Sequence, residues 1–419
     1  SVLVGGNYQG QGPERNASFT FVDPTARITA DALGHGNGGT VIAWADDTTR
    51  YYGSISAKGA GAGANGGFVE TSGKYMLMAL GQVDASAPGG LSGTWLLDPN
   101  NITIQAAGSD TSVVGTTNLF SSNDSAIVTT ASIQNALNAG TSVAVTTNAG
   151  GTNGQAGDIT VASAIAKSAG GNATLTLNAY NDIVFNPGSN VSSSAGQLGI
   201  TLNAGRSINS AANINTNGGL LTFNAAGASS TQSGVISGTG GLTKTGIGTL
   251  MLQGANTYTG APTVSAGTLN IQSATALGGT GTGTTVATGA ALELQGGITV
   301  GAEALSINGT GVGGTGALRN ISGNNTWGGL VTLAGNSEIQ SDAGLLTLSA
   351  ANSVAGNTRT LTFDGAGNGL ISGTITTTTG GLTKIGIGSL TLQGANTYTG
   401  ATTVSAGTLN IQSATALGG

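Results

Sequence analysis

The sequence of 419 residues has no cysteine, a single histidine and only 6 prolines. The absence of cysteine excludes disulfide bonds, thiolate metal sites and a cysteine nucleophile. It also suits a chain that crosses membranes unfolded, because no premature crosslink would block its passage. The one histidine, His35, has no second histidine or cysteine with which to build a metal site or a catalytic triad. We therefore expect His35 to be a solvated residue of a turn.

Charge is also scarce. Charged residues make up 7% of the chain, against about 25% in an ordinary globular domain, and the net charge is −6. This balance argues against nucleic-acid binding, which needs a basic surface, and against docking on anionic lipid. No apolar run approaches the roughly 20 residues of a membrane-spanning helix, so we expect no membrane-spanning segment. The first residues carry no signal peptide and the last stop inside a repeat, so both ends look like cuts in a longer protein.

Glycine and short apolar runs fill the sequence instead. The chain has 76 glycines, and hydrophobic residues make up 38% of it. Abundant glycine with little charge can indicate a disordered, low-complexity chain. Here, however, valine, isoleucine and leucine recur in short alternating runs, which are typical of half-buried strands. The pattern therefore favours an ordered all-β protein.

A long internal repeat is plain in the sequence. Residues 240–279 and 380–419 are identical at 36 of 40 positions. A weaker match extends upstream, where 221–224 aligns with 361–364. Residues 280–360 have no partner in this chain. Such a copy would add nothing to an enzyme active site, whereas it would lengthen a rod.

The spacing of strands and turns predicts a solenoid. Runs of three to six residues, such as 40–44 and 173–177, are bounded by glycine and asparagine from end to end of the chain. A sandwich of this length would need several domains with linkers, and none is evident. We predict a right-handed parallel β-helix, an elongated rod with roughly 20 residues per coil.

Two local features are expected within this solenoid. Residues 131–139 read as one short helical excursion on the side of the solenoid, with Ser132 as its cap, Ile133 and Leu137 on one face and Gly140 at its end. Asparagines that recur with the repeat are candidates for hydrogen-bonded ladders along the axis. These are Asn256, Asn270, Asn396 and Asn410.

The motifs resemble two known families. Residues 5–105 resemble the module of filamentous-haemagglutinin-like exoproteins that are secreted by the two-partner pathway, through strings such as GGTVIAWADDTTRYYGSISAKG at 38–59 and GGFVETSGK at 66–74. Residues 158–184 are similar to the continuation of that family. Residues 240–271 and 380–411 resemble the autotransporter-associated strand repeat. The predicted organisation of the continuous solenoid is a haemagglutinin-like module (1–220), strand-repeat copy one (221–279), intervening coils (280–360) and copy two (361–419).

Few residues are candidates for catalysis. Asp46 and Asp47 lie beside Arg50, and Glu70 lies near Lys74. A β-helix carbohydrate-active enzyme would align such acids and bases across neighbouring coils. With 17 acids and 11 bases in the whole chain, we interpret these groups as solvated loop charges or weak surface pairs.

Ligand-binding patterns are equally sparse. The segment 150–158 matches a calcium-binding glycine repeat only loosely, and its aspartate does not recur in every coil, so calcium is not expected there. Aromatic residues cluster in the first hundred positions and are either a sugar-stacking platform or core packing, of which we favour packing. They are Trp44, Trp95, Tyr51, Tyr52 and Phe68. A threonine-rich stretch at 376–379 suggests a water-ordering ladder, but its pattern is irregular.

The resemblance implies export across two membranes and a place outside a Gram-negative bacterium or on its outer surface. We expect an adhesin or structural exoprotein, not an enzyme, that mediates attachment, aggregation or biofilm formation. A self-assembling filament or matrix component is the alternative, and a β-helix carbohydrate-active enzyme comes third. Expected partners are an outer-membrane secretion barrel during export, and surface glycans or neighbouring copies of the chain. No catalytic residue, cofactor or metal ligand is assigned.

Overall fold

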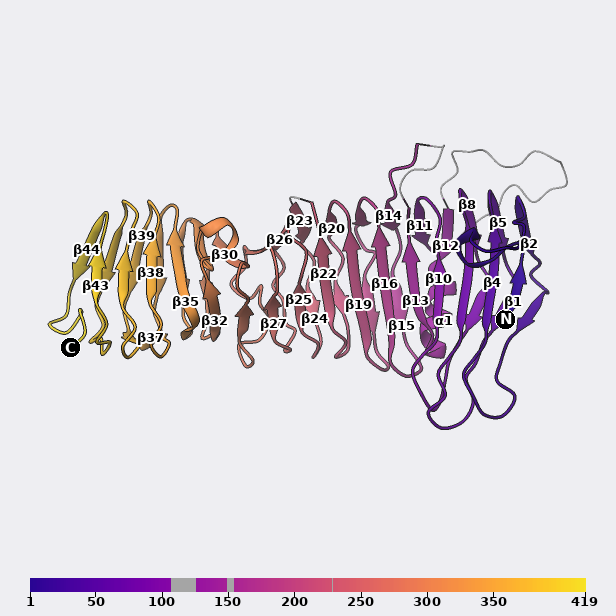
Figure 1. The fold of residues 1–419 in the computed structure, drawn as a ribbon, viewed down its shortest axis with the longest axis horizontal. Helices are drawn as coiled ribbons and strands as arrows, with labels where there is room; N and C mark the ends of the chain where they lie inside the picture. Colours follow the sequence, from indigo (N-terminus) through magenta and orange to yellow (C-terminus); the bar gives the residue numbers. More distant parts are fainter. Residues whose placement is uncertain (107–125, 149–153, 228) are drawn as a thin grey trace. The chain divides into compact units, whose positions relative to one another are not determined.

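The computed structural model describes residues 1–106, 126–148, 154–227 and 229–419. The chain divides into an amino-terminal unit, Ser1–Leu221, and a carboxy-terminal unit, Thr222–Gly419. In each unit the strands pair in parallel, and each coil stacks on the coil before it (Figure 1). The predicted all-β fold, a right-handed parallel β-helix with one helix in its described part, is confirmed. The predicted division into four segments stays a prediction.

The amino-terminal unit has three columns of stacked strands. The first holds β1 (Val2–Val4), β4 (Thr40–Ala45), β7 (Phe68–Gly73), β10 (Thr94–Leu97), β13 (Ser142–Thr146), β16 (Ala173–Ala179) and β19 (Leu198–Ala204). The second holds β2 (Phe19–Val22), β5 (Thr48–Tyr51), β8 (Met76–Ala79), β12 (Ala126–Thr129), β11 (Ile102–Gln105), β14 (Ile159–Val161), β17 (Ile183–Phe185) and β20 (Ile208–Ser210). The third holds β3 (Arg27–Thr29), β6 (Ser54–Ser56) and β9 (Gln82–Asp84), and then β15 (Ile165–Lys167), β18 (Val191–Ser193) and β21 (Ile214–Asn215).

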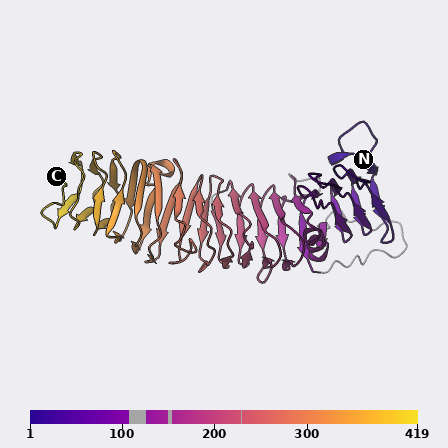
Figure 2. The same ribbon diagram turned by 90° about the horizontal axis from the view of Figure 1, so that it is seen from below.

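The single α-helix of the described residues, α1 (Thr130–Ala139), lies in the third column between β9 and β15, and Figure 2 shows it against the strands of its unit. Gly140 ends it in the left-handed conformation, as predicted, and Ile133 and Leu137 are buried. The prediction that Ser132 caps the helix is wrong, because the Thr129 side chain accepts a hydrogen bond from the Ser132 amide at 3.1 Å. The helix is also not a side excursion: it takes the place of a strand.

The carboxy-terminal unit repeats the three-column arrangement. Its first column holds β22 (Leu221–Ala225), β25 (Leu242–Lys244), β27 (Pro262–Val264), β29 (Thr284–Val286), β32 (Leu305–Gly309), the first part of β35 (Val331–Ser341), β37 (Asn352–Ala355) and β40 (Thr374–Thr376). Its second holds β23 (Ser229–Gln232), β26 (Thr249–Leu252), β28 (Thr268–Ile271), β30 (Ala291–Gln295), β33 (Leu318–Ser322), the last part of β35, β38 (Leu361–Asp364), β41 (Leu382–Lys384) and β43 (Thr402–Val404).

The third column of this unit holds β31 (Thr299–Val300), β34 (Asn324–Trp327), β36 (Leu345–Leu348), β39 (Asn368–Ile371), β42 (Ser389–Leu392) and β44 (Thr408–Ile411). β24 (Ile236–Ser237) precedes them in the chain. Two short 3-10 turns are also present, η1 (Tyr8–Gly10) in the amino-terminal unit and η2 (Val312–Gly314) in the carboxy-terminal unit.

Alternating side chains build the core of each coil. In the second column of the carboxy-terminal unit, Leu269, Leu292, Leu318 and Ile339 are paired in register, and each is 0% exposed. Successive side chains of a strand point to opposite faces, so the residues that flank these four point outward. Burial of each such side chain contributes about 1.5–3 kcal/mol, and this apolar column runs through the unit.

Coil length differs between the units. In the amino-terminal unit Val143 pairs with Leu175, whereas in the carboxy-terminal unit Leu250 pairs with Leu269, which is a much shorter step along the chain. The predicted coil of roughly 20 residues is therefore right for the strand repeats and too short for the amino-terminal unit.

Candidate functional site

A stripe of polar side chains runs along the outside of the second column of the carboxy-terminal unit. We call this the polar stripe, and its members are Asn270, Glu293, Arg319, Gln340 and Asp364. Each is directly opposite the next across successive parallel strands. They alternate with the buried leucine and isoleucine positions, so the strand pairing directs them outward.

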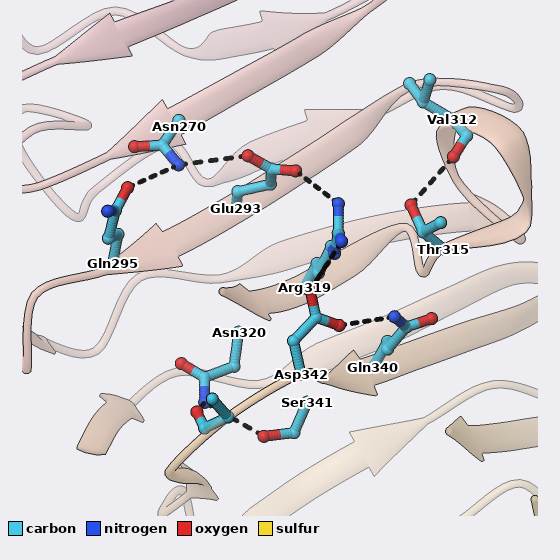
Figure 3. A network of polar contacts seen from close by, with 11 residues as sticks. Asn270, Glu293, Gln295, Val312, Thr315, Arg319, Asn320, Gln340, Ser341 and Asp342 are labelled. Atoms are coloured by element: carbon cyan, nitrogen blue, oxygen red, sulfur yellow. Dashed lines mark hydrogen bonds and ion pairs between the residues drawn. The ribbon is translucent and has the colours of Figure 1, made fainter. Parts of the chain in front are cut away.

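Arg319 is the centre of the stripe (Figure 3). Its Nη1 lies 3.1 Å from Glu293 Oε1, and its Nη2 lies 2.6 Å from Asp342 Oδ2. Asn270 Nδ2 donates to Glu293 Oε2 at 3.1 Å, and Gln340 Nε2 donates to Asp342 Oδ1 at 2.5 Å. Burial alone would lower the pKa of the Arg319 guanidinium, but the bond to Asp342 and its charge hold that pKa above its ordinary value. The side chains of the stripe can form hydrogen bonds or ion pairs with a ligand. The Arg319 guanidinium, however, is already paired with Glu293 and Asp342.

A glycine-rich loop borders the stripe. Figure 3 shows two residues of this loop, Val312 and Thr315, and the Thr315 hydroxyl donates to the Val312 carbonyl at 2.9 Å. Gly316 has φ +95°, and a β-carbon there would lie 2.8 Å from Gln340 Cβ. Only glycine therefore lets the loop approach the stripe this closely.

Sequence reasoning missed this stripe, although a signal was present. The segment 280–360 contains six charged residues, whereas each 40-residue repeat copy contains one lysine and no other charge. Nothing in the order of the residues shows that Glu293, Arg319 and Asp342 meet. They lie 26 and 23 residues apart, and only the stacking of coils brings them together.

Glu70 is a buried group, contrary to the prediction of a solvated charge near Lys74. It is 0% exposed in β7, and the Gln9 amide of η1 donates to its carboxylate at 3.2 Å and 3.3 Å. The Gln9 side chain donates to Asp98 Oδ2 at 2.9 Å, and Asp98 is also buried. Burial raises the pKa of Glu70 to about 7 and that of Asp98 to about 6. Asp98 and Gln9 were not predicted, because they lie in other coils.

The other predicted charged residues have structural roles. The Asp46 carboxylate accepts from Asn16 Nδ2 at 2.9 Å and from Trp44 Nε1 at 3.2 Å. The Asp47 carboxylate accepts from the Thr48 hydroxyl at 3.1 Å. Arg50 is buried in β5, so it is not a solvated loop charge.

His35 lies exposed in its turn, as predicted.

Three of the five aromatic residues that cluster in the first hundred positions belong to the core. Trp44 is 5% exposed, and Trp95 and Tyr51 are 0% exposed, which confirms the packing interpretation for these three. Tyr51 and Trp95 pack edge to face with ring centroids 6.5 Å apart. A sugar-stacking platform would need exposed ring faces, and among these residues only Tyr52 and Phe68 are partly exposed.

The predicted asparagine ladder is wrong for its four members, because they do not bond to one another. Asn256 Nδ2 donates to the Ala276 carbonyl at 2.7 Å, and Asn396 Nδ2 donates to the Ala416 carbonyl at 2.6 Å. These buried amides join coils through the backbone. Asn270 lies in register between Met251 and Glu293, and Asn410 opposite Thr391. The irregular stretch 376–379 also forms no flat ladder, since Thr377 is buried and Thr378 has φ +51°.

A groove of about 720 Å³ lies on the amino-terminal unit and is bordered by small and polar residues of several coils. Leu91 and Leu220 on its rim are 75% and 52% exposed. Among the described residues, no group of three or more histidine, aspartate or glutamate side chains is placed to hold a metal. Residues 150–153 of the weak calcium match lie outside the described residues. No helix of the described part is long and apolar enough to span a membrane.

Two comparisons with known proteins found similarities to this chain. Residues 242–271 and 382–411 match the passenger-associated-transport-repeat family. A region of 192 residues, 46% of this chain, is 35% identical to a protein described as "Adhesin BmaC autotransporter" from Brucella suis biovar 1 (strain 1330). The matched region spans only 4% of that relative's length. The chain thus has parallel β-solenoid strands, and two of its segments match the passenger-associated-transport-repeat family.

Proposed function

We propose that this chain is part of an adhesin that is displayed on the outer surface of a Gram-negative bacterium and mediates attachment. The observation that carries the proposal is the surface of the two repeat copies. In each 40-residue copy, 240–279 and 380–419, the only charged residue is Lys244 or Lys384, and these side chains are buried, at 1% and 0% exposure. A surface without charge is unsuited to acid–base chemistry and suited to hydrogen bonding with neutral partners. The match to an autotransporter adhesin supports this function.

Hydroxyl and amide groups form the outward surface of both copies. Thr243 lies opposite Thr263 in copy one, and Thr383 lies opposite Thr403 in copy two. Amide side chains join successive coils in the same way. Gln253 Nε2 donates to Gln272 Oε1 at 3.1 Å, and Gln393 Nε2 donates to Gln412 Oε1 at 2.9 Å. We propose surface glycans as the partners of these rows, since neutral hydroxyls and amides match the hydrogen-bonding groups of a sugar.

Export through an outer-membrane barrel is part of the proposal. The passenger-associated-transport repeats and the autotransporter relative favour a barrel on the same polypeptide, whereas the haemagglutinin-like motifs of residues 5–105 favour a separate barrel of the two-partner type. The complete gene and its neighbour distinguish the two routes. A barrel domain encoded downstream on the same reading frame would overturn the two-partner route.

Display of the chain on a non-adherent bacterium tests the proposed function. We expect attachment to glycan-coated surfaces to rise above that of the same strain without the chain. Replacement of Gln253, Gln272, Gln393 and Gln412 by glutamate should reduce it, because charge would disrupt the neutral rows. Glu14→Gln, at an exposed position of the other unit, is the matched control. Equal attachment with and without the chain would contradict the proposal.

Self-association is the second candidate, and one observation favours it. Each repeat copy exposes an isoleucine at the same turn, Ile247 at 77% and Ile387 at 79% exposure. Large exposed apolar residues are common in contacts between proteins. The display strain separates the two functions: aggregation of cells without glycan, lost when both isoleucines are replaced by serine, would indicate a filament or matrix role.

A further inference from the structure

A buried carboxylate in the carboxy-terminal unit has one oxygen without a hydrogen-bond partner among the described residues. Glu338, in β35, is only 6% exposed, and its Oε1 has no hydrogen-bond partner among the described residues. Ile339 next to it points into the core at 0% exposure. Glu338 therefore points outward, as does Gln340 on the other side of Ile339. An unpaired buried carboxylate is costly, and native proteins resolve it by protonation, an ion pair or a bound cation.

Three further oxygen-bearing side chains, those of Gln340, Thr362 and Asp364, lie on the same outward face as this carboxylate. On the next coil, Thr362 lies directly opposite Glu338, and Asp364 lies directly opposite Gln340. Phe363 between them points into the core at 1% exposure, so both neighbours point to the same outward face. Glu338 and Asp364 are thus diagonal neighbours, within reach of each other's carboxylates.

Two cationic side chains of the neighbouring strands, Arg319 and Lys384, are engaged elsewhere. Arg319 is held by Glu293 and Asp342. Lys384 points into the core, where its Nζ donates to the carbonyls of Ile385 and Gly386. The charge of Asp364 acts on the Lys384 ammonium and partly offsets the fall in its pKa on burial, but it forms no ion pair with it.

The two carboxylates of the patch therefore act on each other. Burial and the neighbouring Asp364 carboxylate raise the pKa of Glu338 to about 7. The Asp364 Oδ1 accepts from the Gly365 amide at 2.6 Å, which leaves its second oxygen for another partner. A cation between the two groups would remove their repulsion.

We propose that Glu338, Gln340, Thr362 and Asp364 form a binding site for a divalent cation, most suitably Ca²⁺. Two carboxylates, an amide oxygen and a hydroxyl are the hard oxygen ligands that calcium prefers, and its flexible geometry suits ligands from two coils completed by water. The Gln340 side chain can turn its oxygen to this role, because its Nε2 donates to Asp342. The cation would join β35 to β38, which both precede the second 40-residue repeat segment (380–419) in the chain. This inference does not depend on adhesion.

Calcium titration of the purified chain tests the site. After treatment with EDTA, we expect residues 1–419 to bind one Ca²⁺ with a Kd of about 0.1–1 mM, the range of extracellular calcium modules. Calorimetry measures the binding, and hydrogen exchange measures slower exchange at 337–341 and 361–364. Glu338→Gln and Asp364→Asn should each weaken binding at least about tenfold, as expected for loss of a charged ligand. Glu293→Gln, in the same column but paired with Arg319, should leave the Kd unchanged.

The contrary results are equally clear. Absence of any Ca²⁺ effect on the wild-type chain at 10 mM would overturn the proposal without the need for a variant. If calcium binds with the same Kd in Glu338→Gln and Asp364→Asn, the ion occupies another place and the assignment is wrong. Glu338→Gln also reports on folding, since removal of a buried unpaired charge should make the calcium-free chain no less stable than the wild type.

Discussion

The two repeat copies have nearly the same sequence but lie on different faces of the carboxy-terminal unit. Lys244 and its strand β25 belong to the first column, whereas the equivalent Lys384 and β41 belong to the second. Likewise β26 is in the second column and its equivalent β42 is in the third. Between the copies, the chain therefore completes several coils and then advances by one more strand. As a result, equivalent strands of the two copies lie in neighbouring columns. The repeat fixes the chemistry of a surface, and the coil lengths between copies decide where that surface points.

The largest expected effect is in the core leucines. Leu250→Ala and the equivalent Leu390→Ala should each destabilise the unit by about 3 kcal/mol, since both side chains are 0% exposed and each substitution opens a cavity. Urea unfolding measures both values. A clear difference between the two losses would show that the column of the strand, and not the repeat sequence alone, decides the packing.

The buried lysines should show the next effect. Lys244 Nζ donates to the carbonyls of Thr245 and Gly246 at 3.0 Å and 2.6 Å. Lys244→Met should cost about 2 kcal/mol at pH 7, since it removes charged hydrogen bonds from buried carbonyls. Lys384→Met should cost a similar amount by the same reasoning. Urea unfolding at pH 7 measures both, and an unchanged stability in either variant would contradict this role of its lysine.

The pH dependence separates these two lysines. Burial lowers the pKa of Lys244 to about 8, while burial of Lys384 is partly offset by Asp364. Because the folded pKa lies below the unfolded one, the folded state binds fewer protons between pH 8 and about 10.5, and stability rises with pH in that window. Below pH 8 the contribution is constant. Between pH 7 and 10.5, the rise of the free energy of unfolding with pH should be reduced more by Lys244→Met than by Lys384→Met. The reverse order would refute the proposed difference between the two lysines.

The smallest contrast changes sign between the copies. The Tyr398 hydroxyl shares a hydrogen bond of 2.7 Å with Thr402, whereas copy one has Pro262 at that position and the buried Tyr258 hydroxyl has no partner among the described residues. Tyr398→Phe should therefore cost about 1 kcal/mol, and Tyr258→Phe should be neutral or stabilising. Thermal unfolding measures both. Pro262→Thr should make Tyr258→Phe costly as well, and its failure to do so would indicate another partner for Tyr258.

Local signals in the sequence predicted much of this structure. Alternating apolar residues and glycine-rich turns indicated the parallel strands, and Ile133, Leu137 and Gly140 located the helix. Thr129 was missed as the cap because Ser132 has a similar intrinsic preference, and the choice depends on where β12 ends. Neither the polar stripe nor the proposed cation site was predicted from the sequence. Glu338 and Asp364 lie in different coils, and no short motif reports a contact that depends on coil length.

The sequence by itself determined the fold class, the chemistry of the repeat surface and the absence of thiol chemistry, because these follow from composition and from periods of a few residues. The tertiary structure alone decided which side chains meet and which way each copy points. Parallel stacking joins residues one coil apart, and the coil from Leu250 to Leu269 is much shorter than the coil from Val143 to Leu175. A change in the length of one coil shifts every later residue of its unit around the axis. The face on which a residue lies therefore depends on the lengths of all the coils before it.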